Sequence, residues 1–448
     1  MTPYGTYKPS GIGWIRDIPE HWQLKRLKCI AHRSEVKVEP DDDIVLPYVG
    51  LEHIEPWKGR LLGVDEALVR NAGSSRFEVG DTLFGKLRPY LAKACNVDFQ
   101  GVCSSELLVL RGTTCDRGFL LYLLLSPGFI SLVDSSTYGS KMPRANWDFI
   151  GTCELPLPPV EEQRAIARFL DSQTARIDTL VAKKWELIEK LKEKRSTLVD
   201  RTVVGGLPAQ AAMDAGLEPR PEMKNSEVEW LGKVAKHWQV KPLKHVAHIG
   251  NGSTPARDNA DFWEDGVFPW LNSSAVNLEN VTEATELVST TALRMCHLPK
   301  IQPPAVLVGI TGEGRTRGMA TTLKIDATIN QHIAFIKPMA ARAEAGYLRR
   351  VMDRAYQFLR SESEGGGSTK GAITCDQISN MKVPVPPLAE QRAIAAYLEN
   401  ENIRLDNLTK KFETAIARLT EYRQSLITSA VTGQIDVRHW QAPALQAA

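Results

Sequence analysis

The sequence lacks any long apolar run, any paired cysteine spacing and any metal-binding spacing. Its longest apolar stretch, FLLYLLL at 119–125, is far shorter than the roughly 20 residues of a membrane-spanning helix. Residues 1–22 contain no positive segment followed by an apolar one, so we expect no secretory signal. The seven cysteines are an odd number without CxxC spacing, which indicates reduced thiols in a cytoplasmic protein. The histidines show no spacing that predicts a metal site.

Motifs of several enzyme classes are missing or incomplete. The sequence contains no HExxH motif and no adenine-methyltransferase motif of the NPPF or DPPY kind. GITGEGRT at 309–316 has nearly the spacing of a phosphate-binding P-loop, but Arg315 stands where a lysine is needed. The residues that follow predict a strand, whereas a P-loop needs a helix N-terminus to hold phosphate. We therefore expect no catalytic site and no bound cofactor on this chain.

The composition is that of a globular protein with more than one domain. The chain has 448 residues, of which 43% are hydrophobic and 24% are charged, so two or three domains with their own cores are expected. The formal net charge is only +2. That value neither requires nor excludes a nucleic-acid partner, because a basic surface can be offset by acidic residues elsewhere.

The most informative feature is an internal repeat. PLPPVEEQRAIARFL at 156–170 returns as PVPPLAEQRAIAAYL at 384–398, and at this offset of 228 residues 21 of the 51 positions from 155 to 205 are identical. Near the start, WIRDIPEHWQLKRLKCIA at 14–31 pairs with WLGKVAKHWQVKPLKHVA at 230–247. Between these segments the similarity is thin. The two halves therefore share a framework and differ in the residues that it carries.

Each half consists of a globular part followed by a long helix. The globular parts mix short β-rich runs with Gly, Pro and Asn breakers and contain a helix near 116–133 or 344–360, which predicts an α+β fold. A proline-rich stop then precedes about 40 residues without Gly or Pro, and Gly205 and Gly433 suit the helix ends. We predict a first domain at 1–152, a helix at 153–204, a linker at 205–227, a second domain at 228–380, a second helix at 381–433 and a tail at 434–448.

Heptad spacing indicates what the helices pack against. Leucines or other apolar residues recur every seven positions in both helices, with Lys184 as an interruption in the first. An ordinary amphipathic helix lying on its own domain is the alternative, but two matching helices, each too long for its domain to cover, favour pairing with each other. The expected seam consists of Ile177, Leu180, Leu187, Leu191, Leu198, Leu405, Leu408, Phe412, Leu419 and Leu426.

The order of these segments resembles the specificity subunit of type I restriction-modification enzymes over essentially the whole chain. The resemblance rests on both EQRAIA helices and on GDTLFGKLRPYL at 80–91, SSELLVLR at 104–111, MPRANWDF at 142–149 and NQHIAFIKP at 330–338. It implies two target recognition domains that read the two halves of a gapped, asymmetric site on double-stranded DNA. It also implies that the long helices form an antiparallel coiled coil, which sets the spacing between the domains.

The resemblance further implies a cytoplasmic complex in which this chain is the non-catalytic part. Modification subunits, expected to be two, would methylate adenine at N6 with S-adenosylmethionine, and restriction subunits would supply an ATP- and Mg-dependent nuclease and translocase. Two other interpretations stay open from the residues alone. One is a coiled-coil scaffold that does not bind DNA, and the other is a self-sufficient DNA-modifying enzyme.

Candidate DNA contacts are basic or aromatic residues in loops, because arginine can read guanine and lysine mostly holds phosphate. Solvated surface charge is the competing explanation for about half of such a set. The candidates are Lys86, Arg88, Tyr90, Lys93, Lys141 and Arg144 in the first domain, and Arg315, Arg317, Lys324 and Lys370 in the second. The pair Arg315 and Arg317 is the strongest of these, because two arginines in a Gly-flanked loop have little structural reason to be there.

Four repeated residues stand at the start of the long helices. Gln163, Arg164, Gln391 and Arg392 are expected at the junction between globular domain and helix, where they would fix the angle of the helix or meet the modification subunit. Local capping and packing explain them equally well. Trp22 and Trp238, which precede the shared QxK segment in each copy, are expected to pack in the core.

Overall fold

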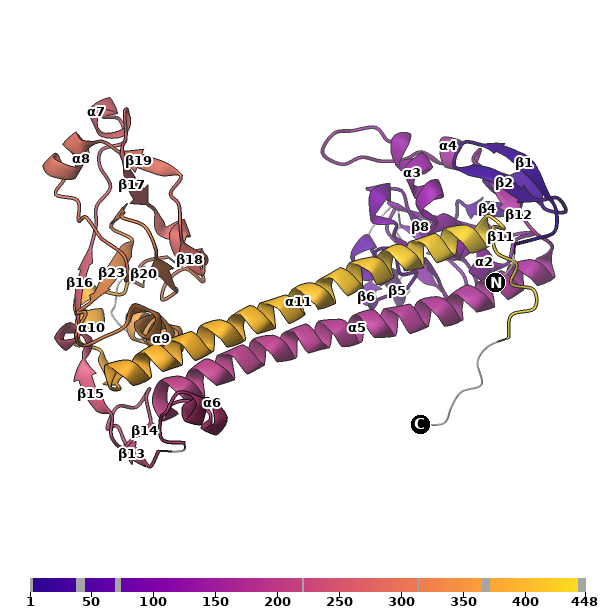
Figure 1. Ribbon diagram of the computed structural model, residues 1–448. Helices are drawn as coiled ribbons and strands as arrows, with labels where there is room; N and C mark the ends of the chain where they lie inside the picture. The colour runs from indigo at the N-terminus through magenta and orange to yellow at the C-terminus, as the bar shows by residue number, and fades with distance from the viewer. Residues whose placement is uncertain are drawn as a thin grey trace. The chain divides into compact units, whose positions relative to one another are not determined.

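The computed structural model describes residues 3–37, 45–68, 74–219, 221–312, 314–364 and 371–441. The chain divides into two units, one formed by 1–185 with 412–448 and the other by 186–411. Each unit holds one globular domain together with one half of each long helix (Figure 1). The α+β prediction is therefore confirmed, and the repeat in the sequence is also a repeat in the structure.

The first domain is built from two four-stranded sheets with helices beside them. One sheet has the order β4-β11-β8-β9 and the other β6-β5-β10-β7. The pair β1-β2 is a hairpin at the start of the domain, and the pair β12-β3 joins its first and last segments. The strands are β1 Tyr7–Ile12, β2 Ile15–Pro19, β3 Gln23–Arg26, β4 Ala31–Ser34, β5 Val45–Val49, β6 Asp65–Leu68, β7 Ser75–Phe77, β8 Thr82–Gly85, β9 Ala94–Asn96, β10 Gly101–Cys103, β11 Leu107–Gly112 and β12 Glu154–Leu157.

The helices of the first domain are short. They are α1 Leu27–Ile30, α2 Arg117–Leu124, α3 Pro127–Ser135 and α4 Trp147–Ile150. The expected helix at 116–133 is thus two helices, because Pro127 cannot continue α2 but suits the start of α3. Among the described residues no single helix is long and apolar enough to cross a membrane. Taken together α2 and α3 meet that test, with a bend of 58° between them.

The second domain repeats this plan with different lengths. Its larger sheet has the order β16-β23-β20-β21-β18 and its smaller sheet the order β19-β17-β22. The elements are α6 Ala209–Asp214, β13 Met223–Asn225, β14 Lys233–Ala235, β15 Gln239–Pro242, β16 Ala247–Asn251, α7 Ala260–Trp263, β17 Phe268–Leu271, β18 Asn280–Val281, β19 Glu286–Val288, α8 Thr290–Met295, β20 Ala305–Gly309, β21 Ala320–Leu323, β22 Thr328–Ile329, β23 Ile333–Pro338, α9 Ala345–Glu364, α10 Cys375–Asn380 and β24 Lys382–Val385.

Strand pairing shows the repeat even where the sequences differ. β4, β11, β8 and β9 correspond in order to β16, β23, β20 and β21, and the parallel pair β5-β10 corresponds to β17-β22. In both copies the strand after the HWQ segment pairs antiparallel with the strand before the proline stop, as β3-β12 and β15-β24. The polypeptide therefore enters and leaves each domain at one place, next to the long helix.

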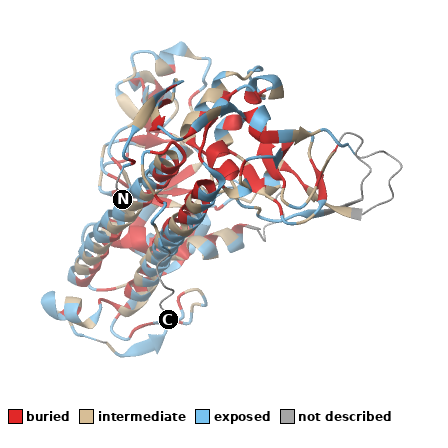
Figure 2. Cartoon of the chain, turned by 90° about the vertical axis from the view of Figure 1, so that its right-hand side faces the viewer, coloured by how far each residue is buried: buried red, intermediate tan, exposed pale blue. Residues whose placement is uncertain are grey.

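Buried residues concentrate in the sheets and in the helices that cover them (Figure 2). In the second domain α9 packs on β20 and β21, whereas α7, α8, β17 and β19 lie at the end farthest from the long helices (Figure 1). Trp22 and Trp238 are fully buried, which confirms their predicted core position. Each contributes to the main core of its own unit.

The segment predicted as a linker is partly folded. Residues 209–214 form α6, and Leu207 and Ala212 are buried in the main core of the second unit. Part of the predicted linker 205–227 is therefore packed against the second unit, while its bounds as a connector stay a prediction. This packing arises because its apolar residues find partners in Val199 and Val203 at the end of the preceding helix.

The long helices are α5 Val160–Gly205 and α11 Leu388–Val431. Each begins a few residues later than predicted, because β12 and β24 occupy the residues before the proline stops. Each is followed by a glycine at positive φ, Gly206 at +81° and Gly433 at +73°, as a left-handed helix end requires. The two helices run antiparallel within each unit, since Lys184 meets Phe412 in the first and Arg195 meets Asp406 in the second.

The predicted seam has two rows of residues along each helix, one that contains Ile177 and Leu405 and a companion row three residues further on. The structure agrees with the first row and differs from the prediction in the companion row of α5. Ile177, Leu405 and Leu426 are buried, and Leu191, Leu198, Leu408, Phe412 and Leu419 are partly buried. Leu180 and Leu187 are instead 42% and 43% exposed, and Val181 and Ile188 take their place. The companion row thus lies four residues after the first row, not three. Polar Asn402 and Arg423 occupy the corresponding row of α11, which hid it from an apolar pattern.

Candidate nucleic-acid interface

Three loops of the first domain meet beside the end of β8. The backbone N–H of Arg88 donates to the carbonyl of Pro143 at 2.7 Å, and Ala145 donates to the carbonyl of Lys86 at 2.9 Å. Lys86 donates in turn to the carbonyl of Glu106 at 3.0 Å. The GKLRPY and MPRAN segments, about 55 positions apart in the sequence, are thereby joined through the turn before β11. We call residues 86–90, 104–106 and 138–146 the interface loops of the first domain.

Most of the basic candidates of the first domain lie in these loops. Arg88, Tyr90 and Lys141 are exposed, and Arg88 has a left-handed backbone with φ +51°. A non-glycine residue in that conformation is uncommon and is often held for function. Lys86 lines a groove of about 320 Å³ that also contains Arg33, Lys37 and Ser105. These placements fit contacts to phosphates, which stay a prediction.

Lys93 has a different environment. It is partly buried, and its Nζ donates to the carbonyl of Leu51 at 2.6 Å. That bond ties β9 to the short turn after β5. The bond uses one of the three donors of the ammonium group, so a DNA contact of Lys93 stays a prediction.

The second domain forms the same junction with other residues. Ile310 donates to the carbonyl of His332 at 2.9 Å, as Lys86 does to Glu106, and Ile373 donates to the carbonyl of Ile310 at 2.8 Å. Thr311 bridges to Ala372 as Leu87 bridges to Arg144. The interface loops of the second domain are therefore residues 310–312, 314–316, 330–332 and 371–373. They use equivalent backbone positions for entirely different side chains.

The basic candidates of the second domain differ in exposure and in their position relative to the interface loops. Arg315 is exposed, and its carbonyl accepts from the hydroxyl of Tyr356 at 3.0 Å. Arg317 is only 4% exposed, so the expectation that both arginines project from this loop is wrong. Its guanidinium packs beside Gly371, where an added Cβ would collide with it. Lys324 is exposed but follows β21, outside the interface loops, and Lys370 lies outside the described residues.

A chain of hydrogen-bonded polar side chains in the second domain is not among the predicted site residues. Thr311 Oγ1 lies 2.8 Å from His332 Nδ1, Gln331 Nε2 lies 3.3 Å from His332 Nε2, and Thr254 donates to Gln331 Oε1 at 2.6 Å. The spacing of the histidines predicts no metal site, and a search for basic residues in loops does not select Thr311, Gln331 or His332. The useful signal was the repeat itself, because NQH and SSE occupy the same turn in the two copies.

Glu162 and Glu390 anchor the long helices to their domains. The carboxylate of Glu390 lies 2.9 Å from His237 Nε2 and accepts from Trp238 Nε1 at 3.0 Å. In the first copy Glu162 binds His21 and Trp22 at the same distances and also accepts from the hydroxyl of Tyr4. The HW pair of the sequence repeat is therefore the partner of the EQRAIA glutamate. Burial, together with Glu162, raises the pKa of Tyr4 well above its usual value, so its hydroxyl stays protonated as a donor.

Gln163 and Gln391 are buried at the same joints. Gln163 accepts from the backbone N–H of Asp116 at 2.7 Å and donates to the carbonyl of Pro158 at 2.8 Å. Gln391 accepts from Glu344 at 3.0 Å and donates to the carbonyl of Pro386 at 2.9 Å. The first amide thus joins the start of α5 to the start of α2, and the second joins the start of α11 to the start of α9. Arg164 and Arg392 are exposed, and Arg164 pairs with Glu161.

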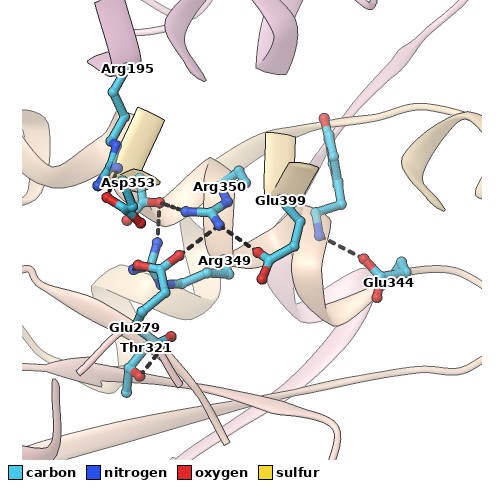
Figure 3. Close-up of polar contacts among 10 residues, drawn as sticks. Arg195, Glu279, Thr321, Glu344, Arg349, Arg350, Asp353 and Glu399 are labelled. Atoms are coloured by element: carbon cyan, nitrogen blue, oxygen red, sulfur yellow. Dashed lines mark hydrogen bonds and ion pairs between the residues drawn. The ribbon is translucent and has the colours of Figure 1, made fainter. Parts of the chain in front are cut away.

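A charged cluster links the second domain to both long helices (Figure 3). Arg350 on α9 donates to Glu279 at 2.7 Å and to Glu399 on α11 at 3.1 Å, and Arg349 donates to Glu279 at 3.1 Å. Burial raises the pKa of Glu279, but Arg349 and Arg350 outweigh it, and the net pKa is below the usual value. Glu279 precedes β18, so the cluster connects the large sheet directly to the helix pair.

The first domain makes the equivalent link with fewer charges. Tyr122 on α2 donates to Asp171 at 2.8 Å and lies 3.1 Å from Thr174, both on α5. At the offset of 228, Asp171 and Thr174 correspond to Glu399 and Asn402. The joints therefore keep their positions in both copies while their chemistry differs.

A matched pair of inter-helix ion pairs gives a stability prediction. Arg423 and Arg195 are equivalent at the offset of 228, as are their partners Asp178 and Asp406. The Arg423 side chain is 4% exposed and also donates to the carbonyl of Trp57 at 2.8 Å, whereas the Arg195 side chain is 40% exposed. We expect Arg423→Met to lower the free energy of opening of the first unit by about 2–3 kcal/mol, because the carbonyl of Trp57 loses a charged donor and the Asp178 carboxylate loses a charged neighbour. That carboxylate is 12% exposed and keeps its ion pair with Lys58, which limits the loss.

Arg195→Met is the control for this prediction. Its exposed pair should contribute about 0–1 kcal/mol, so hydrogen exchange in the second unit should change little. Equal effects of the two substitutions would show that burial does not distinguish these pairs.

Comparison with known proteins gives a consistent family. The model of the family described as "Type I restriction modification DNA specificity domain" matches residues 81–190 and 235–418. The putative type I restriction enzyme MjaX specificity subunit of Methanocaldococcus jannaschii is 23% identical over 455 aligned positions, covering 96% of this chain and 97% of that protein. The EcoDI specificity subunit of Escherichia coli is 25% identical over 198 residues, and the match spans 44% of each chain, less than half of that relative.

Solved structures share the fold. A chain from a study of complex assembly and conformational transition of the type I R-M system superposes with a TM-score of 0.73 at 20% identity, covering 93% of this chain and 99% of that one. The HsdS subunit from Thermoanaerobacter tengcongensis superposes with a TM-score of 0.57, also at 20% identity, covering 93% and 98%. At these identities the likeness concerns the fold alone.

Proposed function

Because this chain belongs to the family of type I restriction modification DNA specificity domains, we propose that it selects the DNA sequence for a type I restriction-modification enzyme. The observation that carries the proposal is the repeated backbone junction with unlike side chains. Lys86, Glu106 and Arg144 in one domain stand where Ile310, His332 and Ala372 stand in the other. Two domains with the same backbone arrangement and different side chains at equivalent positions can bind two different half-sites.

The paired helices support a gap between the half-sites. In this proposal they hold the two domains at a fixed separation, so that the base pairs between the half-sites are not read. The antiparallel pairing within each unit and the buried joints at Gln163 and Gln391 support a rigid spacer. The DNA site is then gapped and asymmetric.

The partners follow from the role of a specificity subunit. We propose two modification subunits, one for each copy of the repeat, which transfer a methyl group from S-adenosylmethionine to adenine N6. Restriction subunits with ATP and Mg would complete a cytoplasmic complex, and this chain would contribute no catalytic group. Support for two like partners comes from the duplicated framework, because two equivalent surfaces can bind two copies of one protein.

Exchange of recognition domains tests the proposal. The structure narrows the segment to exchange from the predicted domain 228–380 to 243–381, which leaves β15, β24, Trp238 and Glu390 in place. We expect replacement of 243–381 by the matching segment of a relative to change one half of the methylated motif and leave the other half and the gap unchanged. Methylated adenines should be mapped across a genome that expresses the complex.

The matched experiment exchanges residues 27–153, which lie between β3 and β12 of the first domain. It should change only the other half of the motif. Methylation without a gapped motif, or none from an intact complex, would contradict the proposal. Absence of salt-dependent DNA binding by the complex would support the scaffold alternative. Adenine methylation by the purified chain alone would support the self-sufficient enzyme.

A further inference from the structure

Arg144 in the interface loops of the first domain is held in one orientation by Glu106. Its Nε donates to the two carboxylate oxygens at 3.0 and 3.2 Å, and its Nη2 donates to Oε1 at 2.9 Å. The backbones on both sides are fixed as well, because Arg144 and Tyr138 exchange two N–H···O bonds of 3.1 Å. Glu106 accepts from Lys86 through its carbonyl, and its own N–H donates to Ser104 Oγ at 3.2 Å.

The locked guanidinium still has donors to offer. An arginine carries five N–H groups in a planar fork, and the contact with Glu106 occupies one edge of that fork. The Nη1 donors and the second Nη2 donor lie away from that edge. The Arg144 side chain is 39% exposed, so a ligand can reach it. Two parallel donors on a rigid fork match O6 and N7 of guanine in the major groove.

Neighbouring residues can hold the DNA backbone while Arg144 contacts a guanine. Arg88 and Lys141, both exposed, belong to the same loops and can hold phosphates while Arg144 contacts a base edge. A side chain fixed before binding loses little conformational entropy on binding, which favours discrimination between bases over general attraction to the backbone.

The second domain cannot make this contact. Its equivalent of Arg144 is Ala372, and its equivalent of Glu106 is His332, which lies 2.8 Å from Thr311. The two copies therefore differ most sharply at one backbone position of the shared junction. Such a difference is expected where one half-site contains a base that the other lacks.

We propose that Arg144, oriented by Glu106, reads one guanine in the half-site of the first domain. This inference rests on the proposed function and adds a residue, a positioning partner and a base to it. Arg144 contacts the base directly, and Glu106 acts through Arg144 as a positioning residue.

A second bidentate pair of the same domain provides a control. Arg111 donates to both oxygens of Asp81 at 2.8 Å, but Asp81 is buried and the pair joins the other end of β11 to the residue before β8. Like the Arg144–Glu106 pair, this is an arginine bound to both oxygens of one carboxylate, but it lies outside the interface loops. Arg111→Lys should therefore leave the methylated motif unchanged.

The test compares the complexes of the wild type, Arg144→Gln, Glu106→Gln and Arg111→Lys. The half-site of the first domain is first identified by exchange of residues 27–153. Binding is then measured for a panel of duplexes in which each base pair of that half-site is varied in turn. In the wild type one G·C pair should be preferred, and Arg144→Gln should reduce that preference by about 10- to 100-fold at this position alone. Glu106→Gln should reduce it less, because the arginine remains but is no longer fixed.

Several outcomes would overturn the inference. They are a half-site without a G·C pair, an unchanged preference in Arg144→Gln, and an even loss of affinity across all duplexes, which would indicate a phosphate contact. Loss of binding in Arg144→Gln because the domain unfolds would appear as lost hydrogen-exchange protection in the first unit. Arg144→Lys, which keeps the charge and loses the planar fork, then serves as the folding-competent variant and should still lose the preference. Absence of any gapped motif in the wild type would contradict the proposed function instead.

Discussion

Deleting one heptad from each long helix, residues 181–187 and 409–415, will shorten the unread gap of the DNA site by about three base pairs. Seven residues of helix span about 10 Å, and B-DNA rises about 3.4 Å for each base pair. The deleted segments are equivalent at the offset of 228 and contain the Lys184–Phe412 contact. The flanking pairs Asp178–Arg423 and Arg195–Asp406 remain, and Ile188 and Ile416 move into the places of Val181 and Thr409.

The deletion should also reduce the rate of methylation. Removing a heptad turns the helix pair by only about 20°, whereas three base pairs turn the DNA by about 100°, since one turn takes about 10.5 base pairs. The two domains would then approach different sides of the duplex. Inserting three heptads in each helix changes the length by about 31 Å, or about nine base pairs and close to a full turn, so this variant should methylate its longer site faster than the deletion methylates its shorter one.

Methylome mapping of these variants measures both the gap and the extent of methylation. Leu187→Gln keeps the helix length and changes an exposed residue, so its motif should match the wild type. An unchanged gap after the heptad deletion, with the complex intact, would show that the helix pair does not set the spacing.

The sequence predicted the framework well because the framework is local and repeated. Proline stops, glycine ends and heptad leucines are signals carried by neighbouring residues, and they placed α5 and α11 to within a few residues. The companion row of the seam was shifted by one residue because Asn402 and Arg423 are polar, and only the structure shows that the buried arginine pairs with Asp178 and donates to the carbonyl of Trp57. Apolar periodicity cannot detect a row that contains paired charges.

The candidate interface was predictable only in part. The search for basic residues in loops selected Lys86, Arg88, Lys141 and Arg144, which the structure brings into the interface loops, although their DNA contacts stay predictions. The strand predicted after GITGEGRT is present as β21. The same reasoning chose Arg317, which is buried, because sequence gives no information on which residue of an RTR segment turns inward. Glu106 and His332 were missed for a related reason. Their equivalence depends on hydrogen bonds between segments far apart in the chain.

Removing Trp22 or Trp238, which joins each domain to its long helix, should strongly lower the stability of that unit. We expect Trp238→Ala to lower the free energy of opening of the second unit by about 3–5 kcal/mol, the range for removal of a large buried aromatic side chain. Of the two side chains that bind the buried carboxylate of Glu390, His237 and Trp238, His237 would remain. Hydrogen exchange of residues 186–411 measures this loss. Exposed Trp185→Ala, at the boundary of the first unit, is a control in which both units should stay within about 0.5 kcal/mol of the wild type.

Trp22→Ala makes the same cavity in the first unit but should cost less. Glu162 retains Tyr4 as well as His21, so its carboxylate loses one of three partners and stays better satisfied. The difference between Trp238→Ala and Trp22→Ala therefore measures what Tyr4 adds to the first joint. A combined Tyr4→Phe and Trp22→Ala variant should bring the loss in the first unit up to that of Trp238→Ala. If Trp22→Ala alone already matches Trp238→Ala, the hydroxyl of Tyr4 does not compensate for the lost indole.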